Sequence, residues 1–129
     1  MTNTPKGELA IQTLAMPADT NANGDIFGGW IVSQMDLAAG ILAKRLAMGR
    51  VATVAIHSMS FLKAVHVGDL VSCYVTLLKQ GNTSMTFSVE VWAHPATQND
   101  AYQVTEGVFV FVAIDEERRP RQVPKKYDQ

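Results

Sequence analysis

Apolar and polar residues recur with two different periods, and the change of period divides the chain into a helical part and a β part. From residue 28 to about residue 48, apolar positions are spaced three and four apart, as in a helix that packs one face on a core. This predicted stripe consists of Ile31, Met35, Ala38, Leu42 and Leu46. Gly49 follows, where a helix commonly stops. The pattern predicts one helix that is about 30 Å long.

Segments rich in β-branched and aromatic residues lie on both sides of this helix. One precedes it, at residues 8–16, and ends at Pro17. The others follow it, at residues 51–62, 69–80, 84–94 and 101–115. Because segments 64–68 and 80–83 have the length of hairpin turns, we expect antiparallel pairing between consecutive strands. A run of strands after one helix predicts an α+β fold, with an antiparallel sheet wrapped around one long central helix.

The composition is that of an ordinary globular protein. With 129 residues we expect a single domain, residues 1–129, in which 116–129 form a charged C-terminal tail over the surface. Eleven Lys and Arg against twelve Asp and Glu give no reason to expect nucleic acid or an anionic membrane as partner. The first residues have the features of neither a secretory signal nor a transit peptide, and the apolar runs are too short for us to expect a membrane span. These features predict a soluble, cytoplasmic protein.

The cysteine and the histidines offer little catalytic or metal-binding chemistry. Cys73 lies in an apolar strand pattern, which predicts a buried and unreactive thiol. His57, His66 and His94 lack the spacing of metal ligands, so no metal site is predicted. The Gly-x-Ser-x-Gly motif of serine hydrolases is also missing.

Asp36 is unusual in the predicted helix, because aspartate is a poor helix former. It lies beside the core-facing stripe. Its neighbours one turn away are Val32, Ser33, Ala39 and Gly40. Since most of these are small, we expect a niche that another backbone or a slim ligand can approach. The simpler alternative is a surface carboxylate that is solvated or pairs with Lys44.

Gly28 and Gly29 begin the helix and leave their backbone N–H groups accessible. A helix N-terminus carries partial positive charge, so these groups could stabilise a developing oxyanion. Glycines at this position more often only permit a turn, so the pair alone is weak evidence.

The run NANGDIFGGWIVSQMD at residues 21–36, with SMSFLKAVHVGD at 58–69, resembles the hotdog-fold acyl-CoA thioesterases. The likeness is greatest to the small bacterial broad-specificity enzymes of the YciA type and extends over residues 12–124. It implies a double-hotdog homodimer, often assembled as a trimer of dimers and therefore a hexamer. It also implies hydrolysis of acyl-CoA, which we expect to carry short- to medium-chain acyl groups, with no cofactor.

The same resemblance assigns roles to site residues. It implies that Asp36 is the catalytic carboxylate and that Asn21 comes from the other subunit, so that each active site is shared. Without the resemblance, Asn21 would be read as a turn residue that bonds its own backbone. Many relatives have His before the glycine pair, whereas this chain has Phe27, which cannot donate a hydrogen bond. Oxyanion stabilisation is therefore expected from the N–H groups of Gly28 and Gly29.

The mechanism and two rival functions stay open at this point. Asp36 acts either as general base for water, which we prefer, or as nucleophile, and Asn21 either orients the water or bonds the thioester carbonyl. A noncatalytic acyl-CoA or small-ligand binding module would lack the helix carboxylate. A hotdog dehydratase would need a histidine near the helix start, and none is there.

The phosphates of CoA need cations or backbone donors. The candidates are Lys63, the turn residues Asn82, Thr83 and Ser84, and the basic tail residues Arg118, Arg119, Arg121, Lys125 and Lys126. Each also has a simpler interpretation, as a hairpin turn or as solubilising charge.

Overall fold

The computed structural model describes residues 4–125. Strand β1 (Glu8–Leu14) and the short 3-10 helix η1 (Pro17–Asp19) precede helix α1 (Gly28–Ala47). The remaining elements are strands β2 (Val51–Phe61), β3 (Leu70–Gln80), β4 (Ser84–His94) and β5 (Tyr102–Ala113). The helix and all five strands lie within two residues of their predicted bounds. The α+β prediction is confirmed.

The five strands form one antiparallel sheet in the order β1-β3-β4-β5-β2. The β3–β4 connection is a hairpin, as expected. The expected hairpin between β2 and β3 is wrong, because β2 pairs with β5 and β3 pairs with β1. The connection between β2 and β3 is instead held by other segments: Ile26 N–H donates to Val65 C=O, and Ala15 N–H donates to Asp69 C=O. A short connection permits a hairpin but does not determine which strands pair in the sheet.

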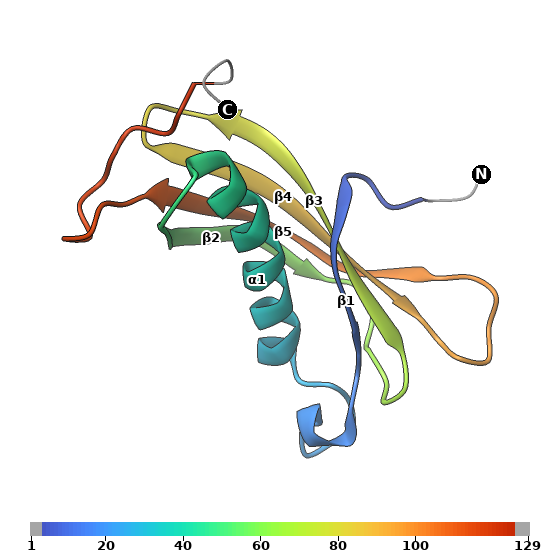
Figure 1. Cartoon of the computed structure of the whole chain (residues 1–129). Coiled ribbons are helices and arrows are strands. Elements are labelled where there is room, and N and C mark those ends of the chain that lie inside the picture. Colours follow the sequence, from blue (N-terminus) through green and yellow to red (C-terminus); the bar gives the residue numbers. More distant parts are fainter. Residues whose placement is uncertain (1–3, 126–129) are drawn as a thin grey trace.

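Helix α1 lies across one face of the curved sheet (Figure 1). Ile31, Met35 and Ala38 are buried, as the pattern predicted. Leu42 and Leu46 are only half-buried, and the buried positions in this half of the helix are Ala39, Ala43 and Ala47. Small side chains there let the helix approach the sheet closely, and the two leucines pack at its flank instead.

The two edge strands are β1 and β2, and β2 has the features of an edge to which a further strand can pair. Among the described residues it pairs on one side only, with β5. Its register shifts twice, and Ser58 has a left-handed φ of 57°. Val54, Ile56 and Phe61 on this strand are exposed. An exposed, apolar edge strand is a surface to which another chain can add.

The C-terminal segment is more ordered than a trailing tail. Ile114 and Pro120 form a β-bridge. Val123 is buried, and its N–H donates to Asn82 C=O over 2.7 Å. Lys126, one of the basic candidates, lies outside the described residues. Within residues 4–125, no helix combines the length and hydropathy that crossing a membrane requires.

Candidate active site

Helix α1 begins with free backbone donors. Phe27 is the N-cap residue, with extended φ and ψ of −76° and 148°, and its side chain makes no capping hydrogen bond. Trp30 N–H donates to Phe27 C=O, but the N–H groups of Gly28 and Gly29 donate to no acceptor in the described part of the chain. The ring of Phe61 lies beside Gly28 and the ring of Phe27 beside Gly29. Two unpaired donors at the positive end of the helix dipole therefore lie beside aromatic rings.

Asn21 belongs to the loop between η1 and α1, which precedes this helix end. Its Oδ1 accepts the N–H groups of Asn23, at 2.9 Å, and Asp25, at 3.2 Å. Its C=O accepts the N–H of Gly24. The turn role that the sequence offered as an alternative is therefore real. Within residues 4–125, however, no hydrogen bond is donated by its side-chain amide, and the residue is exposed. The turn fixes the oxygen and leaves the NH₂ free to donate outward.

Asp36 lies near the middle of α1 and faces edge strand β2. It is half-buried, and its Oδ1 accepts a 2.7 Å hydrogen bond from Thr53 Oγ1. Asp36 forms no ion pair with any residue of the described chain, so the alternative pairing with Lys44 is not observed. Thr53 was not identified from the sequence, since a hydroxyl residue in a strand of mixed composition carries no distinguishing signal. A hydrogen bond from a fixed hydroxyl holds a carboxylate in one orientation.

The prediction that small neighbours form an open niche beside Asp36 is wrong in part. Ala39 is fully buried, and a Cβ on Gly40 would lie 3.6 Å from the ring of Phe111. These small residues face the sheet and serve close packing of the helix. Asp36 itself stays half-buried beside edge strand β2, from which Thr53 donates to it.

The candidate catalytic groups form two clusters in one protomer. Asn21, Gly28 and Gly29 lie at the helix N-terminus, and Asp36 and Thr53 lie farther along. Asp36 lies eight positions after Gly28 on the helix, which is about 12 Å along the axis at 1.5 Å per residue. One thioester group therefore cannot place its carbonyl oxygen at the glycine N–H groups and its carbon beside a water held by Asp36 of the same protomer.

Lys63 lies just after β2, in a region of its own. Its Nζ lies 5.4 Å from the centre of the Tyr102 ring, and it borders a hollow of about 650 Å³. Tyr102 donates hydrogen bonds to Ala64 C=O and to the buried Asp69. Burial, followed by the charge and hydrogen bond of Asp69, raises the pKa of Tyr102 to about 12. This cluster fastens the β2–β3 connection to β5.

The other predicted CoA contacts lie at the opposite end of the sheet. Phe61 pairs with Thr105, whereas Ser84 pairs with Val112, about 23 Å farther along β5 at 3.3 Å per residue. Lys63 is therefore not brought to the turn formed by Asn82, Thr83 and Ser84.

The same turn adjoins the C-terminal segment, which contains Arg121. Asn82 C=O and Thr83 C=O accept backbone N–H groups from Val123 and Ala113. Arg121 Nε donates to Ile114 C=O over 3.0 Å. The structure thus brings together two of the three predicted groups of CoA contacts.

Cys73 is fully buried, as predicted, and burial raises the pKa of its thiol to about 12. The protonated thiol is a poor nucleophile. Within residues 4–125, no group of three or more His, Cys, Asp and Glu side chains is arranged to hold a metal ion.

Comparison with known proteins gives consistent similarities. The sequence profile of the thioesterase superfamily matches residues 23–98. The acyl-CoA thioester hydrolase YciA of Salmonella typhimurium is 52% identical over 127 residues, which cover 96% of each chain.

Two solved structures share the architecture. HI0827, described as a hexameric broad-specificity acyl-coenzyme A thioesterase, superposes with a TM-score of 0.90 at 52% identity and covers 96% of this chain and 86% of its own. The hexameric thioesterase y2039 of Yersinia pestis gives a TM-score of 0.90 at 53% identity, covering 95% of this chain and 100% of its own.

Proposed function

The chain belongs to the thioesterase superfamily, and on this basis we propose that it is an acyl-CoA thioester hydrolase. Its fold is the hotdog fold, with five antiparallel strands and one long helix. The relatives that are similar over nearly its whole length are named acyl-CoA thioester hydrolases. The observation that carries the proposal is Asp36, a carboxylate held by Thr53 at the open edge of the sheet.

Hydrolysis requires activation of water and stabilisation of the tetrahedral oxyanion. Asp36 takes a proton from water as the oxygen bonds to the acyl carbon, and the carbonyl oxygen becomes an oxyanion. The N–H groups of Gly28 and Gly29 bind this oxyanion. When the carbon–sulfur bond breaks, CoA leaves as a thiolate and takes up a proton, giving free CoA and a fatty acid. The chemistry requires no metal and no redox cofactor.

A complete site needs two copies of the chain, because one carbonyl cannot reach both clusters of one protomer. We infer a homodimer in which β2 of one protomer adds to β2 of its partner. Asp36 and Thr53 of one copy then meet the helix N-terminus of the other. The similar solved structures are described as hexameric, which supports a trimer of such dimers.

Asn21 contributes in this arrangement through its free amide. The turn holds its Oδ1. Its NH₂ can therefore donate to the thioester carbonyl or to the attacking water of the partner's site. A cytoplasmic location is also part of the proposal, since the single reduced cysteine suits a reducing compartment.

The test is release of thiol by purified protein from a panel of acyl-CoA esters of increasing chain length. We expect turnover of short- and medium-chain esters that is unaffected by EDTA. A folded protein that binds CoA and releases no thiol from any ester would support the noncatalytic binding module instead.

A further inference from the structure

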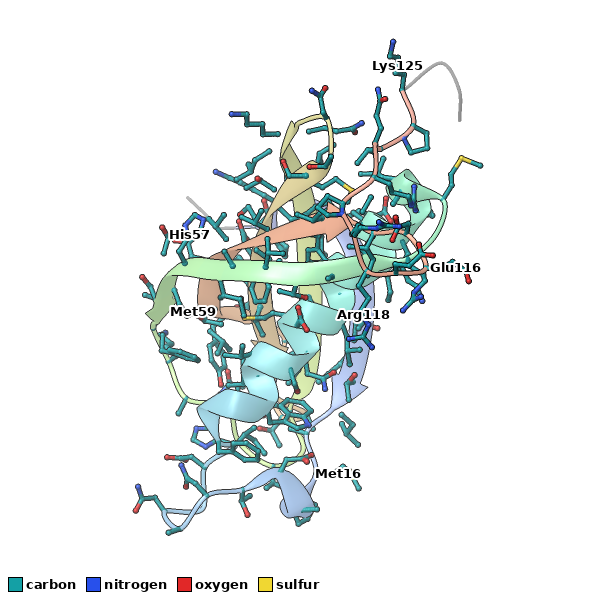
Figure 2. The ribbon with its side chains drawn as sticks, turned by 90° about the vertical axis from the view of Figure 1, so that its left-hand side faces the viewer. Met16, His57, Met59, Glu116, Arg118 and Lys125 are labelled. Carbon is teal, nitrogen blue, oxygen red and sulfur yellow. The ribbon has the colours of Figure 1, made fainter. Side chains whose placement is uncertain are left out.

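The segment between β2 and β3, which we call the 62–69 connection, joins strand β5 to the loop that contains Asn21. In Figure 2 this connection leaves β2 beyond Met59 and runs down to the loop that precedes α1. Leu62 N–H donates to Val104 C=O over 2.7 Å, which fixes the start of the connection to β5. Two side chains hold the residues that follow.

These side chains are Tyr102 and Asp69. The Tyr102 hydroxyl, at the start of β5, lies 2.8 Å from Ala64 C=O and 3.2 Å from Asp69 Oδ2. The same carboxylate oxygen accepts the N–H of His66 over 2.9 Å. Asp69 is buried, with 4% of its surface exposed, so these donors replace the water that its carboxylate has lost. Without the tyrosine hydroxyl, Ala64 C=O and Asp69 each lose a donor.

The other side of the connection contacts the loop of Asn21. Ile26 N–H donates to Val65 C=O over 3.0 Å, and His66 Nδ1 lies 3.4 Å from Asp25 Oδ1. Asp25 closes the turn of Asn21, because its N–H donates to Asn21 Oδ1 and its C=O accepts the Asn21 N–H over 2.7 Å. The placement of the Asn21 amide therefore depends on where the 62–69 connection lies.

Neighbouring residues of the connection bond to different partners. Ala64 C=O accepts from Tyr102, whereas Val65 C=O accepts from Ile26. Because these carbonyls belong to consecutive planar peptide groups, a displacement of one displaces the other. The amide of Asn21 acts only within hydrogen-bond range, so a small displacement of its loop weakens its effect on the reaction.

We propose that Tyr102 is a positioning residue for hydrolysis. It acts through Asp69 and the 62–69 connection, which together hold the amide of Asn21 in place for the site of the partner subunit. Tyr102 acts through these residues and not by contact with the substrate. The proposal rests on the proposed function and on the role given there to Asn21. Lys63, whose Nζ lies over the Tyr102 ring, belongs to the same cluster.

The test is a double-mutant cycle between Tyr102→Phe and Asn21→Asp. Tyr102 is half-buried, and phenylalanine keeps its ring and loses only the hydroxyl, so the variant should fold. We expect kcat to fall about fivefold with KM nearly unchanged, on the scale of one hydrogen bond. Asn21→Asp keeps the oxygen that accepts in the turn and removes the amide that donates. In this background Tyr102→Phe should lower kcat no further, because the group that Tyr102 positions is absent.

The matched control is Tyr74→Phe. It removes a hydroxyl from β3, two strands away from β5, and should leave kcat unchanged.

Hydrogen exchange of backbone amides gives a second readout, which does not depend on turnover. Tyr102→Phe should speed exchange within residues 20–27 at least about threefold, because the hydrogen bonds of Asp25 and Ile26 there are held less firmly. Exchange within β4 should stay as in the wild type. Tyr74→Phe should change neither segment.

An equal loss of kcat from Tyr102→Phe in the wild-type and Asn21→Asp backgrounds would overturn the proposal, because Tyr102 would then act independently of Asn21. Full activity of either single variant would also overturn it, as would unchanged exchange within residues 20–27 of Tyr102→Phe. If the wild type hydrolyses no thioester, the proposed function fails. Hydrogen exchange then still decides whether Tyr102 holds the loop of Asn21.

Discussion

Strands β4 and β2 belong to the same sheet, yet they differ in almost every physical respect. β4 pairs on both sides, and its residues Phe87, Val89 and Val91 are fully buried. β2 pairs on one side within the described chain, shifts register twice and exposes apolar side chains. Burial and complete pairing make β4 a source of stability. The candidate chemistry lies instead beside β2, where Thr53 holds Asp36.

The centre of the sheet therefore stabilises the fold, whereas its β2 edge carries the candidate active site. Changes in β4 should lower stability and leave the chemistry of the folded protein intact. Changes at the β2 edge should lower activity and leave stability nearly intact. A β4 variant that loses activity without losing stability, or a β2 variant that loses stability without losing activity, would contradict this division.

The largest expected effect is on stability. Phe87→Ala removes a fully buried ring that packs edge-on against Phe111, with centroids 6.0 Å apart. The free energy of unfolding in urea should fall by about 3–5 kcal/mol. Phe87→Leu leaves a smaller cavity and should lose less. Equal unfolding midpoints for wild type and Phe87→Ala would show that the centre of the sheet is not the main source of stability.

Asp36→Asn is expected to lower kcat at least about a hundredfold, because the amide cannot accept the proton of water. The urea midpoint should stay close to that of the wild type, since Asp36 is half-buried and makes no ion pair within residues 4–125. CoA binding should persist. Near-normal turnover by this variant would remove Asp36 from the mechanism.

Gly28→Pro tests the oxyanion donor at the first helical position. Proline is favoured there, and the extended φ and ψ of Phe27 suit a residue before proline, so the helix should be retained without this N–H. We expect kcat to fall about a hundredfold, as for loss of one oxyanion donor. The matched control Gly28→Ala keeps the N–H and places its Cβ at an ordinary 3.6 Å from Phe61, so it should stay active. Equal activity of the two variants would exclude the Gly28 N–H from this role.

Thr53→Val should have a smaller effect, about a tenfold loss of kcat, on the scale of one hydrogen bond to a charged group. Valine has a similar shape but no hydroxyl to orient Asp36. Thr53→Ser restores the donor and should recover most of the activity. If both variants lose activity equally through KM, Thr53 serves packing and not positioning.

The sequence predicts the elements well because each depends on local periodicity. The helix and strand bounds follow from apolar spacing, and the burial of Ile31, Met35 and Ala38 follows from the same pattern. The β2–β5 pairing does not follow from local periodicity, because it joins segments about fifty residues apart. It also depends on the hydrogen bonds that hold the connection at residues 62–69.

The candidate site is predicted only in part, for a similar reason. Asp36 and the glycine pair stand out because aspartate and glycine are unusual within a helix. Thr53 is an ordinary residue type for a strand, and only the fold places it beside Asp36.

The central claim is that each active site combines Asp36 of one copy with the helix N-terminus of another. Its most direct test mixes Asp36→Asn protein with Gly28→Pro protein under verified subunit exchange. A mixed dimer then has one site with both groups intact and one with neither. With equal amounts and random pairing, half the dimers are mixed, so activity should return to about a quarter of the wild-type value. A mixture that stays as inactive as either variant alone would contradict the shared site.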